Sequence, residues 1–274
     1  MSTTQSHLFL LPHQDDEFGV FHVLEDVISR GHRPVCVFLT EGSFRGRPGR
    51  RDDESRRVLL ELGVDPQDIH FLGTRLTVPD GDLASHLNVL FDHVNDLVAP
   101  IGPLAAIYVP AWEGGHQDHD AAHALGVGFA AHHDQLAALR QFPLYNADRC
   151  RFWPYRVLSP VTNNGIPEAT LVPISRRFRY LRLCLRYRSQ AKTFLGLLPF
   201  IAAHYALRGV HQLQPVDPLR LRERPHEGPL LYERRNRARF EDLKIFLDNF
   251  IASRSTTRPE LEESKPHEKL HSPR

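Results

Sequence analysis

Residues 7–17 read HLFLLPHQDDE, an apolar run that ends abruptly in a histidine and three acidic residues. A short apolar run bounded by polar residues predicts a buried strand. A second run of this kind, RPVCVFL, follows at residues 33–39. Between the two runs, residues 18–31 have apolar side chains at helical spacing and end in Gly31, a plausible C-cap. These segments predict one strand–helix–strand unit with parallel strands.

The same alternation continues along the first half of the chain. Further helices are predicted at residues 52–62, 83–98 and 121–132, and further strands at residues 69–72 and 105–109. Alternating elements of this length predict an α/β fold: a Rossmann-like three-layer sandwich with a mostly parallel sheet and helices on both faces. Such sheets bind ligands at the carboxyl ends of their strands. The polar residues that directly follow strands are therefore the functional candidates.

The second half is less regular. We expect residues 1–150 to form the core and residues 151–253 to form an extension that completes the domain and caps the substrate site. This extension contains an Arg-rich excursion and a closing helix at residues 232–251. The tail at residues 254–274 is polar and interrupted by prolines, so we expect it to be disordered.

The composition excludes several classes of protein. With 274 residues, 41% of them hydrophobic and 24% charged, the chain is neither collagen-like, nor a coiled coil, nor wholly disordered. No apolar stretch is long enough to span a bilayer, and the N-terminus lacks the basic region of a signal peptide, so we expect a cytoplasmic protein. The 3 cysteines are widely spaced and form no metal knuckle. Any metal is therefore expected to be held by histidines and carboxylates.

The two halves of the chain differ in charge. Residues 1–150 contain 11 arginines against 21 acidic residues, whereas the rest contains 23 basic against 12 acidic residues. The first half also holds 12 of the 17 histidines. Acidic and imidazole groups are the ingredients of metal and proton chemistry, so we expect the chemistry in the first half.

One polar cluster directly follows the first predicted strand. His13 and Asp16 are three residues apart, a spacing that lets both side chains converge on one ion at a strand-to-helix turn. Asp15 could then reach a water molecule bound to that ion. The alternative is that these acids only cap the helix and compensate its dipole. Because His93 and Asp96 have the same spacing inside a predicted helix, the spacing is weak evidence by itself.

A second polar cluster, WEGGHQDHD at residues 112–120, follows another predicted strand. His116 and His119 can face one cavity at the start of a helix, and Asp118 could fix the tautomer of a histidine. The alternative is a polar surface loop. Two such clusters on the same edge of one sheet are less probable by chance than either alone.

Together, PHQDDE at residues 12–17 and GGHQDH at residues 114–119 resemble the paired signatures of the LmbE-like, or PIG-L, deacetylases. The resemblance covers residues 7–130. Members of that family remove acetyl groups from N-acetylglucosamine conjugates using zinc. The resemblance implies that the metal ligands are His13, Asp16 and His119. It further implies that Asp15 is the general base, and that His116, oriented by Asp118, stabilises the tetrahedral intermediate and helps the amine leave.

Four other positions bear on the resemblance. Arg51 and Asp80 are similar to family residues that bind sugar hydroxyls, although Arg47 or Arg50 could replace the former and the latter could be a plain turn aspartate. Gln14 stands where the family most often has proline. Gly114 stands where some relatives have tyrosine.

These observations predict a metal-dependent hydrolase that removes an N-acetyl group from an N-acetylglucosamine-type sugar conjugate by means of metal-activated water. Zn²⁺ is the expected cofactor, while the ligand chemistry alone leaves Fe²⁺ or another divalent metal open. An alternating α/β pattern argues against the non-haem iron oxygenases, which share this ligand set. A metal-dependent phosphoesterase is a lesser alternative, because such enzymes usually need two metals.

A rival prediction belongs to a different class. Arginines alternate with aromatic and aliphatic residues in RRFRYLRLCLRYR at residues 176–188, a pattern that could bind nucleic acid or an anionic membrane, with only a degenerate or structural metal site in the first half. We favour the hydrolase and do not expect nucleic acid as a partner. Peripheral membrane contact through residues 176–208, and a phosphate- or lipid-linked sugar as substrate, remain open. The sequence predicts no oligomeric state.

Overall fold

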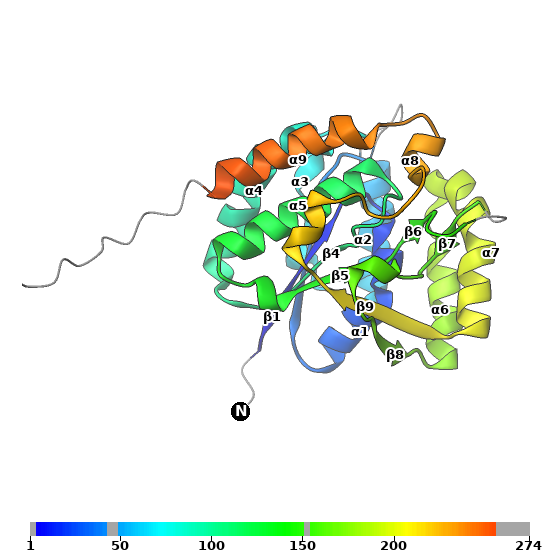
Figure 1. Cartoon of the computed structure of the whole chain (residues 1–274). Coiled ribbons are helices and arrows are strands. Elements are labelled where there is room, and N and C mark those ends of the chain that lie inside the picture. The colour runs from blue at the N-terminus through cyan, green and yellow to red at the C-terminus, as the bar shows by residue number, and fades with distance from the viewer. Residues whose placement is uncertain (1–3, 43–48, 151–153, 256–274) are drawn as a thin grey trace, which may run out of the picture.

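The computed structural model describes residues 4–42, 49–150 and 154–255 (Figure 1). The tail that we expected to be disordered lies outside these residues from position 256 onward. Residues 254 and 255 are an exception, because they form the last turn of α9 (Phe240–Ser255).

A mixed sheet forms the centre of the domain. Across the described residues it contains 7 strands in the order β3-β2-β1-β4-β5-β9-β8. Five of these strands are parallel to one another: β1 (Ser6–Leu11), β2 (Arg33–Phe38), β3 (Ile69–Phe71), β4 (Leu104–Pro110) and β5 (Leu139–Phe142). At one edge, β9 (Val210–Pro215) and β8 (Glu168–Leu171) pair in antiparallel fashion. The predicted mostly parallel α/β sheet is confirmed, but β5, β8 and β9 were not predicted.

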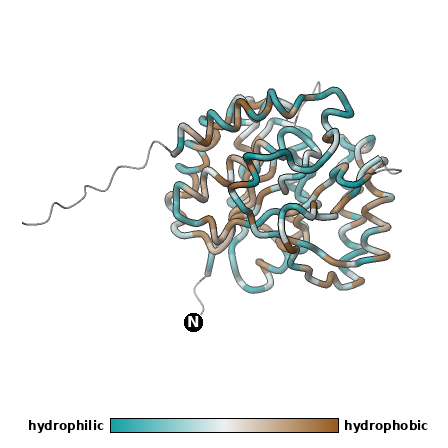
Figure 2. The backbone as a smooth tube through the Cα atoms, in the orientation of Figure 1, coloured by the Kyte–Doolittle hydropathy of each residue, from teal (hydrophilic) through white to brown (hydrophobic). Residues whose placement is uncertain are grey.

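Helices cover both faces of the sheet, which creates two hydrophobic cores. The side chains of β1 alternate between these two cores. Leu8 and Leu10 belong to one core, and Phe9 and Leu11 belong to the other. The first core is closed by α4 (Leu87–Val98), α5 (Gln117–His132) and α9. The second is closed by α1 (Phe21–Ser29), α2 (Arg50–Leu62), α6 (Ile174–Cys184) and α7 (Ala191–Leu207). This is the expected three-layer arrangement, and the outer helices alternate between apolar and polar residues along their length (Figure 2).

Short elements connect these layers. They include α3 (Leu72–Leu76), α8 (Leu231–Arg234) and a two-stranded ribbon of β6 (Tyr145–Asn146) and β7 (Arg156–Val157). The predicted helix at 232–251 is divided into α8 and α9. None of the described helices is long and apolar enough to cross a membrane.

The Arg-rich stretch is largely engaged with the body of the protein. Arg176 and Arg179 both pair with Glu25 of α1, and Arg179 also donates to the Glu61 carbonyl. Arg177 donates to the carbonyls of Val172 and Tyr205 at 2.7 and 3.0 Å. These arginines hold α6 against the domain, which weakens the prediction that the stretch is a free binding surface.

Helix α5 is buried on nearly all sides because it lies between the sheet and α9. Two of its glycines permit this close packing. A Cβ atom on Gly126 would lie 2.3 Å from Val109 Cγ1 of β4, and one on Gly128 would lie 2.7 Å from Phe250 Cε1 of α9. The start of α5 is thereby held close to the end of β4, where the second polar cluster lies.

This packing predicts the effect of adding one methyl group. Gly126→Ala should lower the free energy of unfolding by about 1–3 kcal/mol through overpacking against Val109, although alanine favours a helix by about 1 kcal/mol. Chemical denaturation measures the change. Ala131→Ser, exposed at the end of the same helix, is the control and should have little effect. A Gly126→Ala protein as stable as the wild type would contradict the close packing.

Candidate metal centre and active site

Adjacent strands bring the two predicted clusters together. Strands β1 and β4 are parallel neighbours, so the segments after Leu11 and Pro110 leave the same edge of the sheet. There His13 Nε2 donates to Asp118 Oδ2 at 2.9 Å, across 105 residues of sequence. His13 also lies beside two rings of the second cluster, with centroids 4.6 Å from His116 and 5.3 Å from His119. The residues predicted from two separate motifs therefore form one cluster.

The backbone of the first motif is strained at Asp15. Its φ of 120° lies in the left-handed region, which a non-glycine residue rarely adopts. The Asp15 N–H donates to Glu17 Oε2 at 2.9 Å, which helps to hold this conformation. Asp15 precedes the short 3₁₀ helix Asp16–Gly19, but its side chain makes no capping hydrogen bond with that helix. Simple helix capping therefore does not explain this acid.

Asp16 lies between two imidazoles. Its Oδ2 is 3.0 Å from His13 Nδ1, and its Oδ1 is 3.2 Å from His119 Nε2. The fully buried His119 has only this contact with Asp16 through Nε2, and neither of its ring nitrogens makes a hydrogen bond of regular geometry with a described residue. Burying an imidazole that is incompletely hydrogen-bonded is costly, and ligands of one metal ion lie at about these separations when each bond is about 2.0–2.2 Å long. His13, Asp16 and His119 therefore fit a divalent metal.

His116 is also close enough to contribute a ligand. One nitrogen from each of His13, His116 and His119 can be chosen so that all lie within 4.8 Å of one another. The Asp118 N–H donates to His116 Nδ1 at 3.2 Å. The side chain of His116 is 25% exposed, whereas those of Asp16 and His119 are 5% and 0% exposed. His116 thus lies on the more open side of the cluster, where a substrate would enter.

Asp118 acts mainly on His13. Besides His13 Nε2, its Oδ2 accepts the Gly81 N–H at 2.6 Å, and its Oδ1 accepts the Leu83 N–H at 3.2 Å. Its Oδ2 is 3.8 Å from His116 Nδ1, so the carboxylate orients His13 more directly than it orients His116. A carboxylate on one ring nitrogen leaves the other for a metal. Here the nitrogen left for the metal is Nδ1, the one that faces Asp16.

The charges of the cluster stabilise one another. Burial alone would raise the pKa of Asp16, but His119 and His13 bring that pKa well below its usual range. Burial would lower the pKa of His13, but Asp16 and Asp118 raise it well above its usual value. Burial, reinforced by His13, lowers the pKa of His116 to about 3, which favours its neutral form.

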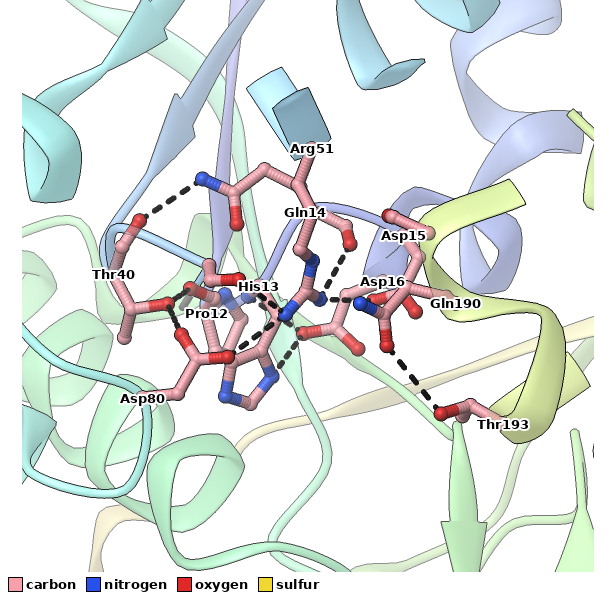
Figure 3. Close-up of polar contacts among 12 residues, drawn as sticks. Pro12, His13, Gln14, Asp15, Asp16, Thr40, Arg51, Asp80, Gln190 and Thr193 are labelled. Carbon is pink, nitrogen blue, oxygen red and sulfur yellow. Dashed lines mark hydrogen bonds and ion pairs between the residues drawn. The ribbon is translucent and has the colours of Figure 1, made fainter. Parts of the chain in front are cut away.

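Asp15 and Arg51 face each other beside this cluster (Figure 3). Arg51 Nη2 lies 3.1 Å from Asp15 Oδ1 and donates to the Gln14 carbonyl at 2.7 Å. Burial raises the pKa of Asp15 to about 8, although Arg51 opposes the shift. A carboxyl group that titrates near neutral pH is suited to accept and return a proton.

The two predicted sugar-binding residues also meet here. Arg51 Nη1 donates to Asp80 Oδ2 at 2.8 Å, and Thr40 Oγ1 donates to Asp80 Oδ1 at 2.7 Å (Figure 3). Arg50, one alternative to Arg51, points instead toward Glu54, at 3.7 Å. The other alternative, Arg47, lies outside the described residues.

Several residues of the site were not found from the sequence. Tyr145 follows β5 on the same edge of the sheet, and its ring centroid is 5.2 Å from that of His119. At the start of α7, Thr193 Oγ1 donates to Gln190 Oε1 at 3.4 Å in the same close-up (Figure 3). Only the position of Tyr145 after a strand could have identified it, and β5 itself was not predicted. Gln190 and Thr193 belong to no motif.

Comparison with known proteins agrees with the motifs. Residues 8–130 match the family model of PIG-L, described as GlcNAc-PI de-N-acetylase. No curated protein matches the chain. The fold, however, is shared with solved structures.

Three of these structures illustrate the likeness. The A40926 pseudoaglycone deacetylase is 18% identical, with a TM-score of 0.58 over 79% of this chain and 98% of that one. A conserved protein of Thermus thermophilus is 24% identical, with a TM-score of 0.53 over 78% and 94%. The N,N′-diacetylchitobiose deacetylase of Pyrococcus horikoshii is 15% identical, with a TM-score of 0.55 over 77% and 83%.

The fold and the buried histidine–carboxylate cluster define an α/β protein with a candidate metal site at the carboxyl edge of its sheet. Residues 8–130 match the PIG-L (LmbE-like) family model, which confirms the resemblance predicted from the two motifs.

The contacts of Asp118 predict a role in metal affinity. Asp118→Asn should lower the affinity for the metal by about 10–100-fold, because the amide supports the His13 tautomer less well than the carboxylate does. Competition with a chromogenic chelator measures the affinity. Asp82→Asn, an exposed aspartate close to Gly81, is the control. Equal affinities in the wild type and both variants would show that Asp118 does not orient a ligand.

Proposed function

We propose that this protein is a metal-dependent hydrolase that removes an N-acetyl group from an N-acetylglucosamine-type sugar conjugate. One observation carries the proposal: the Asp15–Arg51 pair adjoins a buried His13–Asp16–His119 cluster within a PIG-L domain. The solved structures that share the fold include deacetylases of the A40926 pseudoaglycone and of N,N′-diacetylchitobiose, which supports an acetylated sugar as substrate.

We propose His13, Asp16 and His119 as the residues that hold the metal. Two imidazoles and one carboxylate suit Zn²⁺, and the same donors accept Fe²⁺ or another divalent ion. When bound, such an ion lowers the pKa of water and polarises an amide carbonyl. The placement of His119 Nε2 and His13 Nδ1 toward the two oxygens of Asp16 supports this assignment, as does the lack of a described partner for the buried His119 Nδ1.

Asp15 is the proposed general base. Arg51 engages its Oδ1, which leaves Oδ2 to accept a proton from the attacking water. Water adds to the acetyl carbon and its proton passes to Asp15. The C–N bond then breaks, the nitrogen takes up a proton, and acetate and the sugar amine are released. Arg51 keeps the carboxyl group in place through both proton transfers.

His116 is proposed to donate a hydrogen bond to the developing oxyanion. Its Nδ1 accepts the Asp118 N–H, so the proton of the neutral ring lies on Nε2. A neutral imidazole can donate this hydrogen bond without placing a further positive charge beside His13 and Arg51. Asp80 and Arg51 are proposed to bind sugar hydroxyls, because the two side chains pair directly beside Asp15.

Metal content tests the assembly of the site without any choice of substrate. The wild type should retain about one zinc per chain, and His13→Ala and His119→Ala should each lose it. Elemental analysis of protein purified without added metal gives the ratio. His93→Ala, a histidine of α4 outside the cluster, is the control and should keep the metal. A wild type that binds no zinc even when it is supplied would overturn the proposed hydrolase.

The role of Asp15 predicts a separation of binding from turnover. Asp15→Asn should keep the metal and lower kcat by about 10²-fold or more, since an amide cannot accept the proton. Acetate release from an N-acetylglucosamine conjugate measures turnover, with exposed Asp53→Asn as the control. Full activity of Asp15→Asn would remove this residue from the mechanism.

A further inference from the structure

Away from the candidate metal centre, a cavity lined by charged side chains lies between α2 and the end of α6. Its volume is about 620 Å³. Except for one leucine, its lining is entirely charged: Glu54, Arg57, Glu61, Arg182, Leu185, Arg186 and Arg188. None of these residues belongs to the candidate metal centre.

One face of α2 forms half of this cavity. Arg50, Glu54, Arg57 and Glu61 recur at intervals of three or four residues, which places them in a row along the helix. Their charges alternate along the row. The opposite side is purely basic, with Arg182 and Arg186 of the α6 region and Arg188 of the short helix Arg188–Gln190.

Both carboxylates of the cavity are already engaged. Glu61 pairs with Arg182 at 3.0 Å and with Arg186 at 3.4 Å. Glu54 accepts the Ser189 N–H at 3.1 Å and the Ser189 hydroxyl at 2.6 Å. Glu54 also lies 3.7 Å from Arg50, so both acids have partners other than Arg57 and Arg188.

Two arginines consequently remain uncompensated. Arg57 and Arg188 both line the cavity, are exposed, and make no ion pair with any residue that the structure describes. Guanidinium groups present paired N–H donors that match the oxygen atoms of a phosphate. Two free guanidiniums beside two paired ones form a site for an anion with more than one negative charge.

We propose that this cavity binds a phosphate-type multivalent anion. A volume of 620 Å³ would hold on the order of twenty water molecules, which is room for a diphosphate or a phosphate with an attached group. A row of charges that only pair with one another would not leave two arginines without an ion pair beside two acids that already have partners.

The cavity is coupled to the metal centre by short connections. Glu54 lies one helical turn from Arg51, which contacts Asp15. Ser189, which binds Glu54, directly precedes Gln190, which Figure 3 draws in the same close-up as Asp15 and Arg51. The anion is either part of the sugar conjugate or a separate ligand. This connection to catalysis rests on the proposed function, whereas the anion site itself does not.

Inorganic pyrophosphate is the probe for the anion site. Isothermal titration at low salt should show that Arg57→Gln and Arg188→Gln each weaken its binding by about tenfold or more, since each removes charge-assisted hydrogen bonds. Arg56→Gln is the matched control: it removes one charge from the same helix, but its guanidinium lies 4.9 Å from the Phe71 ring centroid and does not line the cavity. Circular dichroism melting checks that the variants fold.

Two results would overturn the proposal: no binding of pyrophosphate by the wild type, or the same affinity in Arg57→Gln and Arg188→Gln as in Arg56→Gln. Pyrophosphate held at the metal centre would give the second result, because these substitutions do not touch that centre. The comparison therefore isolates the cavity.

Kinetics then identify the source of the anion. If the substrate carries it, both variants should raise KM for N-acetylglucosamine 1-phosphate but not for the neutral methyl glycoside of N-acetylglucosamine. If the anion is a separate ligand, KM for both substrates should be unchanged while pyrophosphate binding is lost. If neither sugar is deacetylated, the proposed function fails on these substrates, and the titration still decides whether the cavity binds an anion.

Discussion

The hydrogen bond from His13 to Asp118 is the interaction on which the candidate site depends. It joins the segment after β1 to the segment after β4, and it exists because these strands are parallel neighbours in the sheet. The same carboxylate fixes the Gly81 and Leu83 N–H groups of a third segment. One buried side chain thus ties three loops together, and the orientation of His13 is a consequence of the sheet topology.

The cluster concentrates more buried charge than a domain core normally tolerates. Asp15, Asp16 and Asp118 all lie in the interior, and each would be costly there without a cationic or hydrogen-bonding partner. Arg51 and His13 supply part of the compensation. A divalent cation is suited to supply the rest, because Asp16 lies between His13 and His119 and neither nitrogen of the buried His119 makes a regular hydrogen bond with a described residue. Backbone strain at Asp15 fits the same interpretation, since strained residues persist where the surrounding structure enforces them.

The parts of the fold that the sequence predicted are those with local signals. Apolar runs at β1 and β2 and helical spacing in α2 and α4 are visible in the residues themselves, and the two motifs follow strands directly. Strands β8 and β9 gave no such signal: every residue of β8 is exposed, and β9 is mostly only partly buried. The site shows the same division. His13 and His119 belong to motifs, whereas Tyr145, whose ring lies beside that of His119, belongs to no motif and follows a strand that was not predicted.

The segment outside the family match shapes the site as much as the motifs do. Gly114 has a φ of 65°, and a Cβ atom there would lie 2.6 Å from Leu230 Cδ2, so the loop that carries His116 packs directly on the C-terminal region. The Leu231 N–H donates to the Gly114 carbonyl at 2.8 Å, which fixes this contact. The proposed metal-binding groups come from residues 8–130, but Tyr145 beside His119 and Leu230 beside Gly114 come from beyond them. In the proposed enzyme, the matched domain would therefore determine the reaction, while the remainder of the chain would determine which sugar conjugate reaches it.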